Sequence, residues 1–483
     1  MIPVALKKMS VATIYDFVGM LQIQEYDIPR DLFDACRAES NAVPLGVVPL
    51  FPRSDCYAAV AWWCPRYVMN PHMAVVASTG GGKTTLLRTM IALSSILMGT
   101  VKRGAPRVSV IILDWRRDFT ILPEALGIGK VYRIGSEYTI NPLLGIGTDR
   151  NEVAQNFSHM LLSMGVLEER SIRGITILEK AVHQELQKYE IDRNILLAIS
   201  PSLPTMSNIM DAINEVLHGL GDSATSDDKR SAEAIKRRLT NIASRLESRS
   251  SRTKVLNPLR LLLDPGIHVI DLSELPEAAK KMVMFYITYV AYQAISSQFI
   301  EATYGLDINA VLVIDEAHHI LTALRNKEEA DAQPLMKIIR EGRQYGLAVW
   351  LSTQNPDDVP EHVLNNIGTV FIGRLGVRSK VVEHLFGREI AKLVENIEPL
   401  SFIVRVNTIE TGGARVIPGN RVFKLKLVPY FPPRGSMVTL LTGRTSDAEN
   451  TYKAISKKMI SLVQELRRCG YVSDRGGTEY SAE

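Results

Sequence analysis

The chain has 483 residues, of which 46% are hydrophobic and 22% charged, and its formal net charge is +4. These values exclude a disordered, fibrous or small disulfide-stapled protein and fit a globular chain of two or three units with a substantial core. The four cysteines form no C-x-x-C pair, which argues against structural zinc and favours a reducing compartment, while the mildly basic charge permits a nucleic-acid partner without requiring one.

Two stretches bear on where the protein works. Met1–Met9 lacks the long apolar core of a secretory signal. Met282–Ile300 is long enough to span a bilayer, but its tyrosines, glutamines and serines favour a buried or amphipathic helix. We therefore expect a cytoplasmic protein, either free or at the cytoplasmic face of a membrane complex. An N-terminal anchor outside this sequence stays an open alternative.

Residues 1–65 predict a small N-terminal segment with helices and strands. Helices are expected at 10–22 and 31–37, and strands at 44–52 and 57–63. The segment is large enough for a small β-containing cap.

A phosphate-binding loop follows at residues 77–84, with the sequence Ala-Ser-Thr-Gly-Gly-Gly-Lys-Thr. A short apolar strand precedes it and an apolar helical pattern follows it, which is the context that such a loop requires. The glycines let backbone N–H groups surround the phosphates of ATP, Lys83 is expected to reach the β- and γ-phosphates, and Thr84 is expected to ligate Mg²⁺. The expected nucleotide-binding residues are Ser78, Thr79, Gly80, Gly81, Gly82, Lys83, Thr84 and Thr85.

Ala77 departs from the pattern G-x-x-x-x-G-K-[ST], which has glycine at this position. Alanine is strained there if the backbone needs a positive φ, and harmless if the residue ends a strand. The alternative to a nucleotide site is a glycine-rich surface turn before an ordinary helix.

Residues 66–148 and 255–440 predict the two parts of one α/β core. Strands are expected at 108–113, 131–134, 266–272, 309–314, 347–352 and 370–374, with helices at 277–299 and 334–345. Strands separated by helices on both sides predict a doubly wound, mostly parallel sheet. Short strands are expected at 402–406, 415–417 and 422–427, and residues 441–483 are expected to form a C-terminal helix, at 447–468, and a polar tail.

Residues 149–254 predict a helical subdomain inserted in this core, with helices at 153–165, 172–189 and 205–217. Within 229–254, a further helical stripe contains Ile235, Leu239, Ile242 and Leu246, and it is flanked by Arg238, Arg245, Arg249 and Arg252. Two interpretations of this basic face stay open: a nucleic-acid contact, and a solvated helix face or a subunit interface that supplies arginine to a neighbour.

Polar residues at the ends of predicted strands supply the chemistry that a phosphate loop lacks. Asp315 can hold Mg²⁺ through its water shell, and Glu316 can polarise the water that attacks the γ-phosphate. Gln354 can hydrogen-bond that water or the γ-phosphate, with an ordinary polar turn as the alternative. The run from Asp114 to Phe119 lies where ligands bind in open α/β sheets, or else forms a solvated loop.

Arginines and histidines near these strand ends also have two interpretations. Arg340, Arg343 and Arg374 are candidate arginine fingers, although surface arginines more commonly form ordinary ion pairs. His318 and His319 have no partners at ligand spacing, so the sequence favours a helix-surface or packing role over a metal site.

The order of these motifs, with Ile-Asn-Pro-Leu at 140–143 and Ile-Asp-Leu-Ser at 270–273, resembles the HerA/VirB4 branch of the FtsK–HerA superfamily. Residues 340–346, followed by 352–356, are similar to that branch's region around its sensor glutamine. Across residues 66–430 the resemblance implies a RecA-like ATPase core, a homohexameric ring with nucleotide at subunit interfaces, and DNA drawn through a central channel. It implies the roles given above for Lys83, Thr84, Asp315, Glu316 and Gln354, with an arginine from a neighbouring protomer completing the site.

Residues 1–65 look short for the β-barrel that precedes the HerA core, which favours a DNA-transfer ATPase over a partner of a HerA-type nuclease. The leading hypothesis is a hexameric ATPase that translocates DNA in DNA transfer or import. The alternatives are a conjugation or type IV secretion-like ATPase that acts on pilus subunits or other cargo at a membrane channel, a HerA-type helicase in DNA end processing, and a nucleotide-dependent assembly scaffold.

Overall fold

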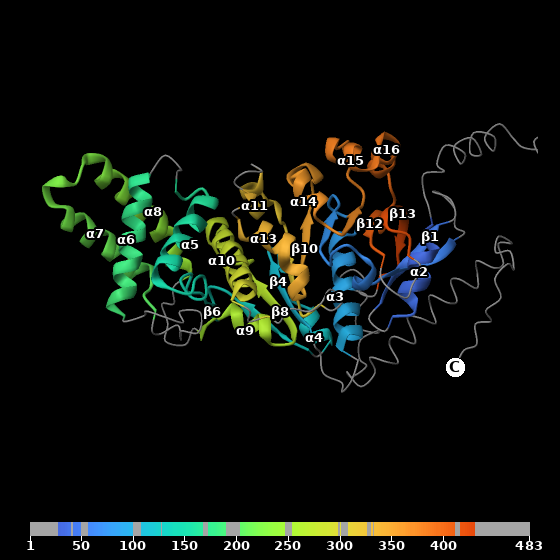
Figure 1. The fold of residues 1–483 in the computed structure, drawn as a ribbon, viewed down its shortest axis with the longest axis horizontal. Helices are drawn as coiled ribbons and strands as arrows, with labels where there is room; N and C mark the ends of the chain where they lie inside the picture. Colours follow the sequence, from blue (N-terminus) through green and yellow to red (C-terminus); the bar gives the residue numbers. More distant parts are fainter. Residues whose placement is uncertain are drawn as a thin grey trace, which may run out of the picture. The chain divides into compact units, whose positions relative to one another are not determined.

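The computed structural model describes residues 28–39, 42–49, 57–99, 108–126, 128–167, 172–189, 203–246, 254–297, 300, 308–325, 330–331, 333–410 and 416–429. The helices expected at 10–22 and 447–468 lie outside the described residues. The described residues form two compact units (Figure 1): unit 1 is drawn from those within 1–69, 75–104 and 368–483, and unit 2 from those within 70–74 and 105–367.

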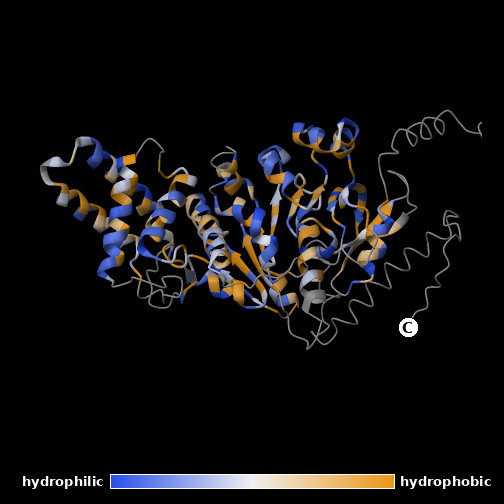
Figure 2. Cartoon of the chain, viewed as in Figure 1, coloured by the Kyte–Doolittle hydropathy of each residue, from blue (hydrophilic) through white to orange (hydrophobic). Residues whose placement is uncertain are grey.

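Unit 2 is built on five parallel strands in the order β10-β9-β4-β8-β5. Their bounds are β4 (Ser109–Asp114), β5 (Lys130–Arg133), β8 (Gly266–Asp271), β9 (Ala310–Ile314) and β10 (Leu347–Thr353). All but β5 are buried along their whole length, as continuous apolar strands covered on both faces must be. The strands β4 and β8 accordingly carry mostly hydrophobic colours in Figure 2.

Helices connect these strands. The connections contain α4 (Leu122–Leu126), α9 (Pro258–Leu263), α10 (Glu277–Ser296), α11 (His318–Leu321), η6 (Thr322–Leu324), α13 (Pro334–Glu341) and η7 (Gly342–Tyr345), while η8 (Pro356–Asp358) and α14 (Glu361–Asn365) follow β10. The helix expected at 334–345 is divided, because its last turn tightens to a 3₁₀ helix that ends at Gly346 with φ 70°. The predicted helix at 277–299 is confirmed as α10, which is buried along most of its length. No helix in the described part of the chain is both long and apolar enough to cross a bilayer.

A group of four helices separates β6 (Tyr138–Thr139) from β7 (Lys254–Val255), two short strands that pair in parallel. The helices are α5 (Arg150–Ser163), α6 (Ile172–Lys188), α7 (Met206–Leu220) and α8 (Ser226–Leu246), with η5 (Gly221–Ser223) between the last two. Thr205 caps α7 through a capping box with Asn208. The stripe of α8 that contains Ile235 and Leu239 is buried as predicted.

The basic face of α8 is only partly described. Arg238 is half-buried and donates to the carbonyl oxygen of Val166, which gives it a packing role inside unit 2. Lys229, Arg230 and Arg237 are exposed. Arg249, Arg252 and the side chain of Arg245 lie outside the described part. The role of this face, as a DNA contact, a solvated face or a subunit interface, therefore stays a prediction.

Unit 1 contains an antiparallel run of strands in the order β2-β1-β13-β12-β11. Their bounds are β1 (Val43–Pro49), β2 (Tyr57–Trp63), β11 (Thr369–Ile372), β12 (Ser401–Thr408) and β13 (Gly419–Leu427). The unit also contains η2 (Pro65–Tyr67) and the helices α2 (Arg30–Arg37), α3 (Lys83–Gly99), α15 (Lys380–Phe386) and α16 (Arg388–Glu395). The N-terminal strands therefore continue the C-terminal ones, through the pairing of β1 with β13.

Strand β3 (Met73–Val76) leads from unit 2 into unit 1 along the chain. These elements confirm the predicted α/β class, with a mostly parallel sheet, a helical insertion and a small N-terminal segment that contains strands. The exact domain limits at residues 65, 148, 254 and 440 stay predictions.

His72 anchors the chain just before β3 within unit 2. The side chain is fully buried, and its Nδ1 accepts a hydrogen bond of 3.0 Å from the backbone N–H of Val349 on β10. The next residue of β10, Trp350, donates from its indole to the carbonyl oxygen of Pro71 at 3.1 Å. Burial lowers the pKa of His72 from 6.5 to about 3, so the imidazole is neutral at neutral pH.

We expect His72 to make the protein less stable in mild acid. The unfolded chain takes up a proton on this histidine below about pH 6.5, whereas the folded chain does so only near pH 3, so stability present above pH 6.5 is lost as the pH falls. This group should lower the free energy of unfolding by about 2 kcal/mol between pH 6.5 and pH 5. Urea unfolding of the wild type and of His72→Gln across this range tests it, and equal pH slopes in the two proteins would contradict it.

Candidate nucleotide-binding and hydrolysis site

The phosphate loop of unit 1 has the backbone that its sequence requires. Gly80 and Gly82 have φ values of 80° and 100°, and α3 begins at Lys83 directly after them. The N–H and the hydroxyl of Ser78 both donate to the carbonyl oxygen of Arg374, at 2.7 and 2.8 Å. Thr79 and Gly80 are exposed. A glycine-rich turn with exposed backbone at a helix N-terminus is suited to binding phosphate.

Leu400 holds the other side of the loop. Its N–H donates to the carbonyl oxygen of Gly81 at 3.3 Å, and its own φ is 63°. A side chain at Gly82 would place its Cβ 2.8 Å from the Leu400 side chain. The loop is therefore braced by the segments that follow β11 and precede β12, which are distant from it in the sequence.

Ala77 is unstrained. Non-glycine residues with a positive φ in the described part are Arg117, Glu316 and Leu400, so Ala77, which directly follows β3, has an ordinary backbone without left-handed strain. Its side chain is fully buried, and a Cβ on Gly373 would come within 2.8 Å of it. The substitution of the usual first glycine by alanine is thus compatible with the loop.

In unit 2, β9 and β10 place the predicted catalytic carboxylate beside the predicted sensor. Ser352 donates to Asp315 Oδ1 at 2.9 Å, and Gln354 Nε2 donates to Glu316 Oε1 at 2.8 Å. The backbone N–H of Ala317 donates to the carbonyl oxygen of Ser352 at 2.7 Å, which fixes the turn after β9. Glu316 has a φ of 49°, a conformation that costs about 1–2 kcal/mol in a non-glycine residue. The sequence predicted no role for Ser352, although the residue lies in the run 352–356.

Several carboxyl groups lie at the carboxyl ends of the neighbouring strands. Asp114 is buried at the end of β4 and accepts backbone hydrogen bonds from Asp118 and Phe119 at 2.8 and 2.7 Å. Burial, together with the charge of Asp315, raises the pKa of Asp114 to about 7 despite these two bonds. Mg²⁺ prefers one or two carboxylates and water, so Asp315 in this acidic setting fits the ligand role predicted for it. Thr84, at the start of α3, has the hydroxyl expected of the second ligand.

The loop after β4 is ordered by its own side chains. Arg117, with a φ of 66°, donates to Asp271 at 2.8 Å and to Glu274 at 2.9 Å. Burial alone would raise the pKa of Asp271, but the Ser273 donors and Arg117 lower it. Trp115 stacks on His319 at a ring distance of 3.8 Å. Arg116 forms an ion pair with Glu316, with 3.3 Å between Nη2 and Oε1. The polar residues from Asp114 to Phe119 predicted a loop at this strand end. Only the fold shows which neighbouring strand end each of their side chains contacts.

The two adjacent histidines have packing and polar contacts. Besides its stack on Trp115, His319 has a pKa that burial and the neighbouring His318 lower to about 4. His318 Nδ1 lies 3.4 Å from Glu316 Oε2. No cluster of three or more metal-ligating residues occurs among the residues that the structure describes. The site residues in unit 2 thus include His318 as a neighbour of Glu316, which the sequence did not predict.

The candidate arginine fingers lie in different places. Arg340 pairs with Asp331 at 2.5 Å on the surface of unit 2. Arg343 is on η7 of the same unit, and burial lowers the pKa of its guanidinium. Arg374 belongs to unit 1, where its carbonyl oxygen supports Ser78 and its side chain is exposed. Which of them reaches a nucleotide stays a prediction.

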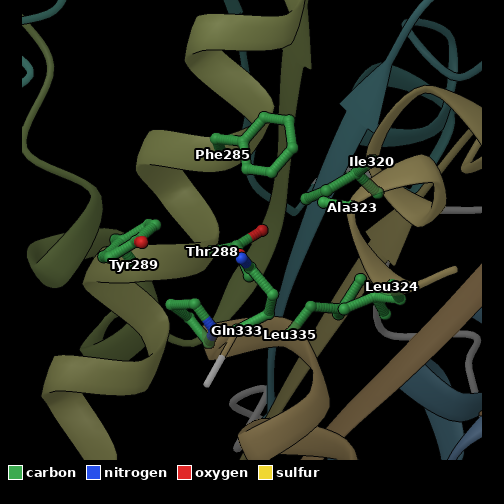
Figure 3. Close-up of a pocket in the computed structure, with 9 residues that line it drawn as sticks. Phe285, Thr288, Tyr289, Ile320, Ala323, Leu324, Gln333 and Leu335 are labelled. Carbon is green, nitrogen blue, oxygen red and sulfur yellow. The ribbon is translucent and has the colours of Figure 1, made fainter. Parts of the chain in front are cut away.

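A small apolar pocket lies apart from these polar groups, between α10, the α11–η6 segment and the start of α13 (Figure 3). Its walls include Phe285, Thr288, Tyr289, Ile320, Leu324 and Leu335. The lining is mostly apolar and contains no lysine or arginine, so the pocket is poorly suited to a phosphate.

Comparisons with known proteins agree with this geometry. A family model described as "Helicase HerA, central domain" matches residues 67–290, and one described as "Zonular occludens toxin (Zot)" matches residues 271–373. The DNA import protein CedB of Sulfolobus acidocaldarius is 25% identical over 65% of this chain and 45% of that protein. The DNA double-strand break repair helicase HerA of Pyrococcus furiosus is 24% identical over 64% of this chain and 57% of that protein. The chain thus spans about half the length of these relatives.

Solved structures show the same fold. VirB4 of Thermoanaerobacter pseudethanolicus matches with a TM-score of 0.55 and 16% identity, over 81% of this chain and 98% of that one. The bacterial conjugative coupling protein TrwB matches with a TM-score of 0.54 and 15% identity, over 83% of this chain and 93% of that one.

The fold and its phosphate loop define a RecA-like P-loop protein. The chain is similar to members of the FtsK–HerA superfamily, in its HerA/VirB4-type branch. The resemblance predicted from the motifs is confirmed.

We expect Gly82→Ala to destabilise the protein more than Gly80→Ala. Both positions have a positive φ, which costs an alanine about 1 kcal/mol, but a Cβ at Gly82 also meets Leu400 at 2.8 Å, whereas nothing lies within 4 Å of one at Gly80. The extra overlap should cost Gly82→Ala about 1–3 kcal/mol more. The free energies of unfolding of the two variants in urea measure the difference, and equal values would show that Leu400 does not brace the loop.

Proposed function

We propose that the chain binds ATP with Mg²⁺ and hydrolyses it. Lys83 holds the β- and γ-phosphates, while Thr84 and Asp315 hold Mg²⁺, which neutralises phosphate charge when bound. Glu316 takes a proton from the attacking water, and Gln354 orients that water or the γ-phosphate. The observation that carries this proposal is the Gln354–Glu316 hydrogen bond at the turn after β9, next to the Asp315–Ser352 contact. Solved structures of TrwB with an ATP analogue, and with ADP and Mg²⁺, support these cofactors.

The energy of hydrolysis is proposed to move DNA. CedB is named as a DNA import protein, HerA as a helicase of DNA double-strand break repair and TrwB as a conjugative coupling protein. We propose a homohexameric ring that draws DNA through its channel at the cytoplasmic face of a membrane complex, with an arginine of a neighbouring protomer completing each site. The exposed Lys229, Arg230 and Arg237 on α8 offer positive charge to phosphates.

Removing the phosphate-binding or the proton-accepting group should abolish hydrolysis without unfolding the protein. We expect Lys83→Ala and Glu316→Gln each to lower kcat for ATP by at least about a hundredfold, as expected when a phosphate clamp or a general base is lost. Phosphate release measures kcat, and thermal unfolding checks the fold. Lys281→Ala and Glu137→Gln, which remove surface charges in unit 2, serve as matched controls that should keep wild-type turnover. Wild-type turnover in Glu316→Gln would overturn its assignment as the base.

If the protein is a DNA motor, DNA should change both its rate of ATP hydrolysis and the mass of its particles. We expect duplex DNA at low salt to raise kcat several-fold and ATP with DNA to assemble the chain into a ring. We also expect the stimulation to fade as salt rises, because phosphate contacts release counterions. Turnover assays and particle mass with each ligand measure these effects. A monomeric chain whose turnover ignores DNA at low salt would contradict the motor and favour an assembly scaffold.

A further inference from the structure

The proposed base is held by a residue of the loop that follows β4. The side chain of Glu316 is 3% exposed, while that of its ion-pair partner Arg116 is 54% exposed. Arg116 and Gln354 both approach the same oxygen of Glu316, Oε1, at 3.3 and 2.8 Å. His318 lies at the other oxygen, 3.4 Å from it. The loop therefore brings a solvent-accessible positive charge to a buried carboxylate.

The neighbours of Arg116 fix the loop on both sides. Arg117 is bound to Asp271, the last residue of β8, and to Glu274, which follows that strand. Trp115 stacks on His319, lies 4.9 Å from Lys280 Nζ and accepts a hydrogen bond of 3.1 Å from it through its carbonyl oxygen. The contacts of Trp115 and Arg117 fix the backbone at Arg116, whereas the side chain of Arg116 is about half exposed to solvent. Such a side chain can exchange partners without disturbing the sheet.

We propose that Arg116 is a positioning residue that holds Glu316 in a resting orientation and restrains ATP hydrolysis until a ligand or partner displaces it. The inference rests on the proposed role of Glu316 as the base. A general base must offer a carboxylate oxygen to a proton of the attacking water. A cation within 3.3 Å of that oxygen draws its electron density and occupies the approach. Contacts of the Glu316 side chain set its orientation. Among the contacts named above, that with Arg116 involves the most exposed partner.

The test compares Arg116→Gln, Arg116→Lys and the control Arg133→Gln, which removes the arginine of an exposed ion pair with Glu137 on the same unit. Without DNA, we expect Arg116→Gln to raise kcat for ATP about two- to fivefold with KM unchanged, the range that a half-exposed ion pair is worth. Arg116→Lys should stay near wild type because it keeps the charge, and Arg133→Gln should not change. A purely structural role for Arg116 would not raise kcat.

Further measurements separate this proposal from the proposed function. Arg116→Gln combined with Glu316→Gln should be as inactive as Glu316→Gln alone, because the effect acts through that carboxylate. The proposal would be overturned if kcat of Arg116→Gln were equal to or below that of the wild type, or if Arg133→Gln raised kcat equally. In either case the proposed function would still stand, provided that wild-type turnover depends on Glu316. A wild-type chain that binds ATP but does not hydrolyse it would instead overturn both. Thermal unfolding confirms that each variant is folded.

Discussion

The parallel register of unit 2 is the constraint on which its chemistry depends. Leu113 of β4 is paired with Ile270 of β8 and with Ile314 of β9, and Ile314 is paired with Leu351 of β10. Parallel strands in register end at the same edge, so the residues that follow each strand lie together there. Asp114, Asp271, Asp315 and Gln354 share that edge for this reason alone. A slip of one residue in any ladder would turn its polar residue to the other face.

Backbone strain is placed where function is proposed. Glu316, Arg117 and Leu400 adopt left-handed conformations, and each is held by contacts that a relaxed backbone would lose. The turn at Glu316 is fixed by Ala317 and Ser352, Arg117 by two carboxylates, and Leu400 by Gly81. Strained residues persist only when the surroundings determine them, and they cluster at working sites. Their occurrence at the loop after β4, at the end of β9 and against the phosphate loop is consistent with the proposed roles.

The two units differ in how their strands are paired and buried. The strands of unit 2 are buried on both faces and read as uninterrupted apolar runs, while those of unit 1 are antiparallel and join the two ends of the described chain through β1 and β13. The pair β6–β7 brings the start and the end of the helical insertion together, so that the helices α5–α8 can be accommodated without interrupting the sheet. This arrangement explains how a chain with an insertion of this size keeps an α/β core.

The sequence by itself determined most elements of the core and the residues proposed for its chemistry, but it did not predict α15 and α16, and the described residues 416–418 do not form the strand expected at 415–417. Continuous apolar strands, the glycine-rich turn before α3 and the acidic end of β9 are local patterns, so their residues were identified without the fold. The positions of Lys83 and Glu316 within their elements follow from the same patterns. The identities of the three catalytic arginine candidates also came from sequence, but their surroundings did not.

Only the tertiary structure decided the contacts between segments that are far apart in the chain. Three such contacts are those of Leu400 with Gly82, Ser352 with Asp315 and Arg116 with Glu316. They depend on which strands are neighbours, and the spacing of residues along the chain does not encode strand order. The same holds for Ala77, which directly follows β3, has an ordinary backbone and lies beside Gly373. The physical reason is that periodicity reports the face on which a residue lies, whereas its partner is set by strand order and register.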